Sequence, residues 1–154
     1  MRAIKSCKMG TLEKAIGIAV NAHRHQKEKA GAPYILHLIR VMGRGNTEIE
    51  KVCGVLHDLV EDTDWTFEQL EGEGVSKEII DVLRCVTKES EEEDYDHFIT
   101  RVKQNKTAIN VKLNDLQDNM DITRLTFITE RDRVRLNKYL KAYRELLEIR
   151  NEGI

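Results

Sequence analysis

Residues of metal-ligating type interrupt otherwise apolar stretches of this sequence. His37 follows Ile35-Leu36, His57 and Asp58 lie between Val55-Leu56 and Leu59-Val60, and Asp115 lies within 109–116. Burying a carboxylate among apolar residues is unfavourable unless a cation or hydrogen-bond donors satisfy it. Two imidazoles and two carboxylates suit an octahedral Mn, Fe, Co or Ni ion, with water completing the coordination, better than a closed structural zinc. The pattern therefore predicts a shared divalent metal site with open positions.

A metal site of this kind indicates a phosphohydrolase, because the ion acidifies bound water and polarises a phosphoryl oxygen. Glu61 follows His57 by four residues and Asp58 by three. Helical spacing would place its carboxylate beside the ion, where it could orient water or relay a proton.

Each of these residues also has a simpler explanation. His37 could be an ordinary core histidine, and a His-Asp dipeptide occurs by chance in many proteins. The run 61–64 could be a polar helix end, and Asp115 with Asn119 could be only an i,i+4 hydrogen-bonded pair. Their occurrence on separate expected helices favours the metal site, but spacing alone leaves both interpretations open.

The elements that must position these residues are expected to be helices. Apolar residues recur at helical spacing nearly throughout, and period-2 alternation is rare. We expect an all-α bundle of about seven to eight helices, with start signals at the only proline, Pro33, and at the capping-box patterns of 47–50 and 66–69. The expected helices span about 12–29, 34–44, 47–60, 66–72, 76–86, 95–104, 108–120 and 131–149.

Composition excludes several classes of protein. With 154 residues, 40% hydrophobic and 34% charged, the chain is expected to form a single domain over 1–154, with its core at about 12–147. A net charge of -2 gives no basic field for a nucleic-acid polymer. The longest apolar stretch, 15–20, is too short to cross a membrane, and the first ten residues lack the apolar region of a signal peptide.

The cysteines indicate a reducing compartment, and we expect a cytoplasmic protein. The chain has three cysteines, Cys7, Cys53 and Cys85, and none forms a CxxC pair. An odd number of widely spaced cysteines implies neither a disulfide framework nor a zinc ribbon.

Two further segments leave alternatives open. The acidic run 89–94 could be a solvent-exposed connector or a lid that moves over a site. The apolar residues of the last helix could pack inside the domain or could form the face of a homodimer. They are Val134, Tyr139, Leu140, Tyr143, Leu146 and Leu147.

Four blocks of sequence, spread over about 12–147, carry a family resemblance. They are Ala22-His23 with Gln26 and 31–37, then 55–63, then 86–88, and finally 111–115 with Asn119-Met120. In order and spacing these blocks resemble the HD-domain phosphohydrolase superfamily, and within it the hydrolase domains of RelA/SpoT-type alarmone enzymes. The part from Asp115 to Tyr139 is more similar to their small stand-alone relatives.

The resemblance implies specific roles. It assigns one divalent ion, typically manganese, to His37, His57, Asp58 and Asp115. It places the acidic pair that activates the hydrolytic water at Glu61 and Asp62. It implies substrate contacts for Lys29 and Asn119, the latter near the ribose. The implied reaction removes the 3′-pyrophosphate from ppGpp-like nucleotides.

The sequence departs from the family at the expected base site. Glu28 stands where related hydrolases carry an Arg that stacks on guanine, and a carboxylate cannot make that contact. Leu116 replaces a usual basic residue, and Asp118 and Asp121 replace a usual His and Arg. Other basic groups could balance the phosphate charge: Arg24, Lys27, Lys29, Lys112 and Arg124.

We therefore expect a manganese-dependent enzyme with (p)ppGpp 3′-pyrophosphohydrolase-like activity and a small nucleotide as its partner. One alternative is an HD-domain nucleotidase or phosphomonoesterase with another substrate. A second alternative is a nucleotide-sensing domain without turnover.

Overall fold

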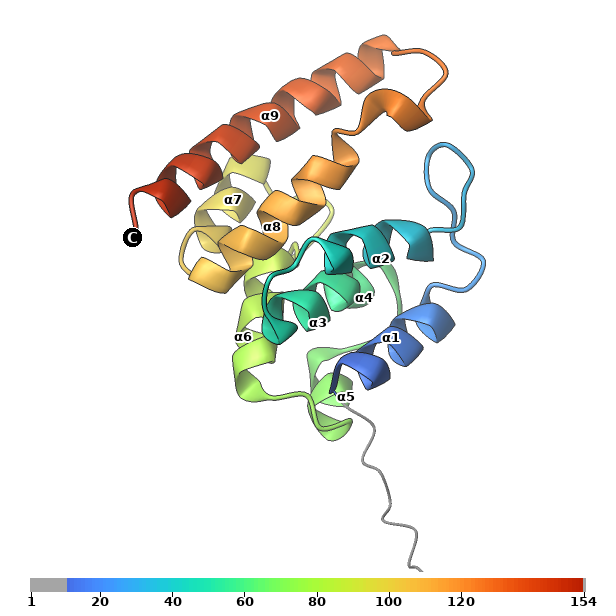
Figure 1. Ribbon diagram of the computed structural model, residues 1–154, viewed down its shortest axis with the longest axis vertical. Coiled ribbons are helices and arrows are strands. Elements are labelled where there is room, and N and C mark those ends of the chain that lie inside the picture. The colour runs from blue at the N-terminus through green and yellow to red at the C-terminus, as the bar shows by residue number, and fades with distance from the viewer. Residues whose placement is uncertain (1–10, 154) are drawn as a thin grey trace, which may run out of the picture.

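The structure is a computed structural model that describes residues 11–153, and within them every regular element is helical (Figure 1). The α-helices are α1 (Thr11–Ala22), α2 (Ile35–Gly43), α3 (Glu48–Leu56), α4 (Leu59–Asp62), α5 (Phe67–Gly72), α6 (Lys77–Val86), α7 (Tyr95–Val102), α8 (Lys106–Asn119) and α9 (Glu130–Asn151), with a 3-10 turn at Ile122–Arg124. The all-α prediction is confirmed. Cys7 and the N-terminal segment considered above lie outside the described residues.

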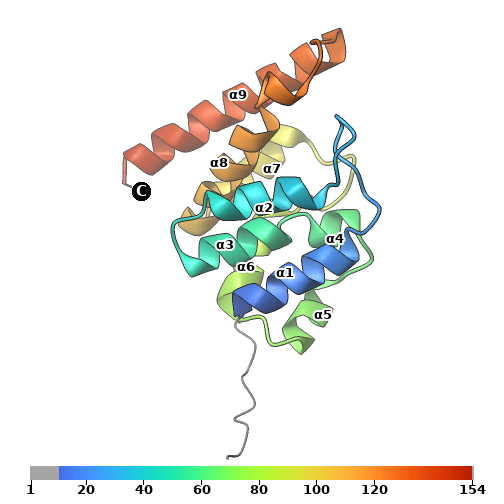
Figure 2. The ribbon, with the colours of Figure 1, turned by 45° about the vertical axis from the view of Figure 1, so that its right-hand side comes forward.

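Helix α3 lies at the centre of the bundle. It packs against α1, α2, α6 and α8, and its residues 52–56 are all buried. Figure 2 shows α1 and α2 along two sides of α3, with α9 crossing α8 at the far edge. The site residues expected on α2, at the end of α3 and on α8 therefore come from helices in direct contact.

Gly54 allows α2 and α3 to approach closely. A Cβ atom on Gly54 would lie 3.1 Å from the Met42 Cα atom. Contacts at that distance are tighter than side chains normally make, so glycine favours this close packing. This close approach also brings His37 of α2 toward the end of α3.

The first helix is shorter than the sequence predicts, which is a correction to the range 12–29. It ends at Ala22, and His25 adopts a positive φ of 72° that a continuing helix does not permit. The chain then folds back in a loop closed by the backbone bridge between Lys27 and Pro33, with Gly31 at a φ of 96°.

The expected helix 47–60 is divided in two. Helix α3 ends at Leu56, His57 and Asp58 form a turn, and α4 begins at Leu59. On a continuous helix these two side chains would point about 100° apart. The turn removes that constraint, so both can face the same point.

The capping signals at 47–50 and 66–69 do start helices. Thr66 and Gln69 form a complete capping box at α5. At α3, Thr47 accepts a hydrogen bond from the Glu50 backbone N–H, but the Glu50 side chain accepts from Asn46 instead.

The acidic run 89–94 is a loop between α6 and α7, as predicted, and it is anchored. The Glu93 side chain, 6% exposed, accepts hydrogen bonds from Arg101 and from the Glu89 backbone N–H.

The last helix packs in part through its predicted apolar face. Leu146 is buried, whereas Val134 and Leu140 are exposed. No helix among residues 11–153 combines the length and apolar character needed to cross a bilayer.

Candidate active site

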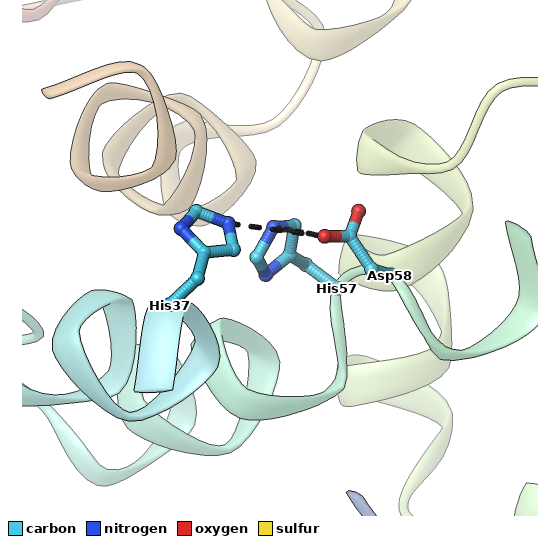
Figure 3. A group of neighbouring side chains, drawn as sticks. All are labelled: His37, His57 and Asp58. Atoms are coloured by element: carbon cyan, nitrogen blue, oxygen red, sulfur yellow. Dashed lines mark ion pairs between the residues drawn. The ribbon is translucent and has the colours of Figure 1, made fainter. Parts of the chain in front are cut away.

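Three of the expected ligands meet between α2 and the turn after α3 (Figure 3). One ligating atom from each of His37, His57 and Asp58 lies within 4.8 Å of the other two. The Asp58 Oδ2 atom is 3.8 Å from His37 Nε2 and 3.1 Å from His57 Nε2. Side chains separated by 20 residues in sequence therefore point at one position.

The fourth expected ligand, Asp115, joins them from α8. Its Oδ1 atom lies 3.1 Å from His37 Nε2 and 3.2 Å from His57 Nε2. Lys112 donates to Asp115 Oδ2 at 2.7 Å, and Asn119 donates to Oδ1 at 2.9 Å. The structure thus brings all four predicted residues together, with Asp115 held by its own helix.

Both imidazoles are oriented through their Nδ1 atoms. The Nδ1 of His57 lies 2.6 Å from the Gly54 carbonyl oxygen, and the Nδ1 of His37 lies 2.6 Å from Asp118 Oδ2. A proton on Nδ1 satisfies each acceptor and leaves the Nε2 lone pair directed at the cluster. Ligating histidines are commonly held in this way. The donor set therefore fits a divalent ion.

The electrostatics of the cluster favour positive charge at its centre. Burial lowers the pKa of His57, but the carboxylates of Asp58 and Asp115 outweigh burial and hold that pKa well above its usual value. Burial acts in the opposite direction on Asp115, yet Lys112 and His57 keep the pKa of this carboxyl well below its usual value. Because metal ligands must be deprotonated, an ion would replace the imidazolium protons as the compensating charge.

Tyr34 is a further contact to the cluster that the sequence pattern did not single out as functional. Its hydroxyl donates to Asp58 Oδ2. Burial and the adjacent Asp58 carboxylate raise the pKa of Tyr34, so the phenol remains a neutral donor. It fixes the orientation of the Asp58 carboxylate.

Asp118 is the second missed contact, and it is fully buried. In addition to His37, its carboxylate accepts hydrogen bonds from Arg40 at 2.8 and 3.1 Å and from Arg44 at 3.0 Å. Arg124 donates to its backbone carbonyl at 2.9 Å. Spacing could have revealed this network, because Arg40 follows His37 by three residues and Asp118 follows Asp115 by three.

The predicted catalytic pair borders the cluster on α4. Glu61 and Asp62 place carboxylate oxygens within 4.8 Å of one another and of Asp58, and both line a cavity of about 410 Å³ beneath the acidic loop. Glu61 Oε1 accepts from the Lys88 backbone N–H at 3.0 Å. Burial, with Asp58 and Glu61 nearby, raises the pKa of Asp62 to about 7.

The predicted substrate-binding residues are dispersed. Lys29 and Asn119 line a cavity of about 200 Å³ beside His37, and Lys29 is also paired with Asp132. Lys112 is mostly buried, with 12% of its side chain exposed, and pairs with Asp115 of the cluster. Arg24 donates to Asn21 of its own turn and does not line that cavity.

Cations that the spacing did not indicate lie on α9 and just after α6, near one another and near Lys112 of α8. Burial and the neighbouring charges of Lys88, Lys112 and Arg135 lower the pKa of Lys138. Mutual repulsion of this kind is relieved when an anion binds between the cations.

Known proteins provide an independent comparison. No family model matches the chain. A guanosine-3′,5′-bis(diphosphate) 3′-pyrophosphohydrolase of Aquifex aeolicus is 31% identical over 121 residues, 71% of this chain and 17% of that protein. A probable enzyme of the same name from Synechocystis sp. is 33% identical over 70% of this chain and 16% of its own length. The chain thus spans about a sixth of the length of these curated relatives.

A solved structure has the same fold. It is described as a metazoan ortholog of SpoT that hydrolyses ppGpp, and it superposes with a TM-score of 0.72 at 23% identity. The match covers 90% of this chain and 86% of the other. The arrangement of helices around the cluster is therefore shared with that protein.

Proposed function

Because the chain belongs to the RelA/SpoT-type family of HD-domain hydrolases, we propose that it is a metal-dependent phosphohydrolase that removes the 3′-pyrophosphate from (p)ppGpp-like nucleotides. The observation that carries the proposal is the convergence of two imidazole Nε2 atoms with the carboxylates of Asp58 and Asp115. His37, His57, Asp58 and Asp115 would hold the ion, for which we propose manganese. When bound, a divalent ion activates water and neutralises charge on phosphoryl oxygens.

The proton movements are assigned to α4. Asp62, with a pKa raised to about 7, is suited to accept the proton of the attacking water at neutral pH. Glu61, held by the Lys88 backbone, positions that water. Attack on phosphorus breaks the bond to the ribose 3′-oxygen, and the proton taken from water neutralises that leaving oxygen.

The cations of α9 would hold the departing pyrophosphate. Lys138 and Arg135 lie in the same group of charges as Lys88, and none of the three belongs to the proposed ligand set. Positive groups placed where phosphate charge develops stabilise the transition state of phosphoryl transfer.

The test is a turnover assay on metal-stripped protein resupplied with Mn²⁺. We expect guanosine diphosphate and pyrophosphate from ppGpp, followed by chromatography and a pyrophosphate assay. Asp58→Asn is expected to lower both Mn²⁺ binding and turnover at least about 100-fold. Asp64→Asn, an exposed carboxylate in the same segment, is the matched control and should behave as wild type.

A second candidate is a nucleotidase or phosphomonoesterase acting through the same cluster. It is favoured by Glu28, which occupies the place of the family's guanine-stacking Arg and is paired with Arg40. Hydrolysis of nucleoside mono-, di- or triphosphates without release of pyrophosphate from ppGpp would replace the first proposal by this one. Cytoplasmic location, homodimer formation and the absence of a nucleic-acid partner remain predictions.

A further inference from the structure

The peptide group that joins Thr87 to Lys88 lies directly after the end of α6. Thr87 is buried, and its hydroxyl donates to the Leu83 carbonyl oxygen at 2.7 Å. The Thr87 carbonyl and the Lys88 N–H belong to one peptide group, which is planar, so they point in opposite directions from a rigid unit. Groups that bind the two edges of this unit are therefore linked mechanically.

Glu61 of α4 binds the N–H edge. Its Oε1 atom accepts from the Lys88 backbone N–H at 3.0 Å. Glu61 is exposed at the wall of the cavity of about 410 Å³, and within residues 11–153 no other group donates to its carboxylate. An exposed glutamate has several rotamers of similar energy, so this one donor selects among them. The position of the Lys88 N–H thus sets the position of the Glu61 carboxylate.

Arg101 of α7 binds the carbonyl edge. Its Nη2 atom donates to the Thr87 carbonyl oxygen at 2.8 Å and to Glu93 Oε2 at 3.0 Å, while Nη1 donates to Glu93 Oε1. The Arg101 side chain is only 17% exposed, and its guanidinium lies 5.4 Å from the centre of the Phe98 ring. Two parallel bonds to a carboxylate fix a guanidinium in one orientation. The donor to the Thr87 carbonyl is therefore held in place.

Arg101 does not reach the reacting groups itself. It does not line the cavity that Glu61 and Asp62 share, and it is not among the groups that could hold the ion. Its influence on Glu61 passes through the peptide group. A cation at the carbonyl and an anion at the N–H polarise the same amide, and hydrogen bonds linked in this way strengthen one another.

We infer that Arg101 is a positioning residue for the hydrolytic reaction: it holds the Thr87–Lys88 peptide group, and this group holds the Glu61 carboxylate toward the attacking water. The inference rests on the proposed function, because that function assigns Glu61 to positioning the water. The contact between Arg101 and Glu93 adds the acidic loop as the support that keeps the guanidinium in place.

The structural test is the hydrogen exchange of the Lys88 amide in the full chain, followed by NMR after labelling with ¹⁵N-lysine. Arg101→Met keeps the length of the side chain and removes its donors, and it should speed exchange at Lys88 at least about tenfold. Exchange at Lys51, whose N–H donates to Thr47 within the bundle, should change by less than about twofold.

Two further variants separate this contact from general damage to α7. Lys103→Met is the matched control, because it removes an ion pair with Glu145 at the end of the same helix, and it should leave exchange at Lys88 unchanged. Arg101→Lys keeps the charge and loses the planar fork, so its exchange rate should lie between those of the wild type and Arg101→Met. Circular dichroism verifies folding of each variant.

The kinetic test combines Arg101→Met with Glu61→Gln. Alone, Arg101→Met should lower kcat for ppGpp about 10- to 100-fold, as expected for a misplaced group, and change KM by less than about twofold. In the Glu61→Gln chain the same substitution should change kcat by less than about threefold, because the group that it positions is already lost.

Failure of this inference and failure of the proposed function give different results. Exchange at Lys88 that is no faster in Arg101→Met than in Lys103→Met overturns the inference, even if ppGpp is hydrolysed. An equal fall in kcat with and without Glu61 also overturns it, since Arg101 would then act on the fold alone. A wild-type chain that releases no pyrophosphate from ppGpp rejects the proposed function, whereas faster exchange at Lys88 still supports the hold of Arg101 on the peptide group.

Discussion

At the scale of single residues, the cluster depends on groups that do not face the proposed ion. His37 is oriented by Asp118, His57 by the Gly54 carbonyl, and Asp58 by Tyr34. Outer contacts of this kind fix which imidazole nitrogen carries the proton and which carries the free lone pair.

Asp118→Asn should therefore weaken Mn²⁺ binding. The amide is a poorer acceptor for the His37 Nδ1–H and leaves Arg40 and Arg44 less well neutralised, so we expect an affinity loss of about 10- to 100-fold. Calorimetric titration of Mn²⁺ measures the loss, with circular dichroism to verify folding. Asp121→Asn, a half-buried carboxylate three residues later that makes no hydrogen bond to His37, is the control. Equal affinities in the two variants would contradict the role of Asp118.

Glu61→Gln should separate metal binding from turnover. Glu61 borders the cluster but is bonded to the Lys88 backbone, so its replacement should leave Mn²⁺ affinity within about twofold while lowering kcat at least about 100-fold. Single-turnover kinetics and metal titration on the same preparation measure both quantities. Unchanged turnover would reject its assignment.

At the scale of elements, the site depends on the spacing of α2, α3 and α8. The two imidazoles come from α2 and from the end of α3, so the packing that brings these helices together also sets the distance between two ligands.

Gly54→Ala tests this dependence. The added methyl would lie 3.1 Å from the Met42 backbone, and overpacking should lower the free energy of unfolding by about 1–3 kcal/mol and weaken Mn²⁺ binding. Gly17→Ala on α1 is the matched control, since nothing lies within 4 Å of its Cβ position. It should stabilise the protein by about 0.5–1 kcal/mol, because alanine favours helix interiors. Urea unfolding measures both effects, and equal stabilities would contradict the argument.

The acidic loop supplies a pH-dependent contribution to stability. Arg101 lowers the pKa of Glu93 from 4.5 to about 2. A carboxyl whose pKa is lower in the folded state stabilises it above the unfolded pKa and loses that contribution as the pH falls from about 5 to 2.

Glu93→Gln should thus lower the free energy of unfolding by about 1–3 kcal/mol at pH 7, as expected for loss of charge-assisted hydrogen bonds. Near pH 2 the substitution should change this free energy very little. Urea unfolding at several pH values measures this difference. Glu92→Gln, in the same loop but exposed, should show no such dependence. A Glu93→Gln deficit that persists at pH 2 would reject the ion pair as its cause.

At the scale of the whole molecule, the metal cluster links three parts of the chain. Its residues come from 37, from 57–58 and from 115, so an ion held there would join α2, the α3–α4 turn and α8. A ligand that binds only the folded state stabilises that state by mass action.

Mn²⁺ at 100 times its Kd should raise the free energy of unfolding by about 2.7 kcal/mol, and a chelator should reverse the gain. Thermal unfolding followed by circular dichroism measures the corresponding rise in Tm. His57→Ala should show no such rise, whereas His97→Ala, an exposed histidine on α7, should keep it. An equal rise in both variants would place the ion elsewhere.

Most of the helices and the candidate metal ligands can be predicted from local sequence. Helical periodicity and caps such as Thr66 and Ser76 predict most of the elements, because these signals act within a few residues. The candidate ligands were also evident, because a carboxylate such as Asp115 is conspicuous among apolar neighbours.

Only the tertiary structure decided how these residues are used. The turn at His57-Asp58, the end of α1 at Ala22 and the partners of Glu28 and Asp118 depend on groups that are distant in sequence. Spacing along one helix specifies which side chains share a face. Packing between helices decides which charged groups pair, because a buried ion pair forms only where the fold brings both partners out of water.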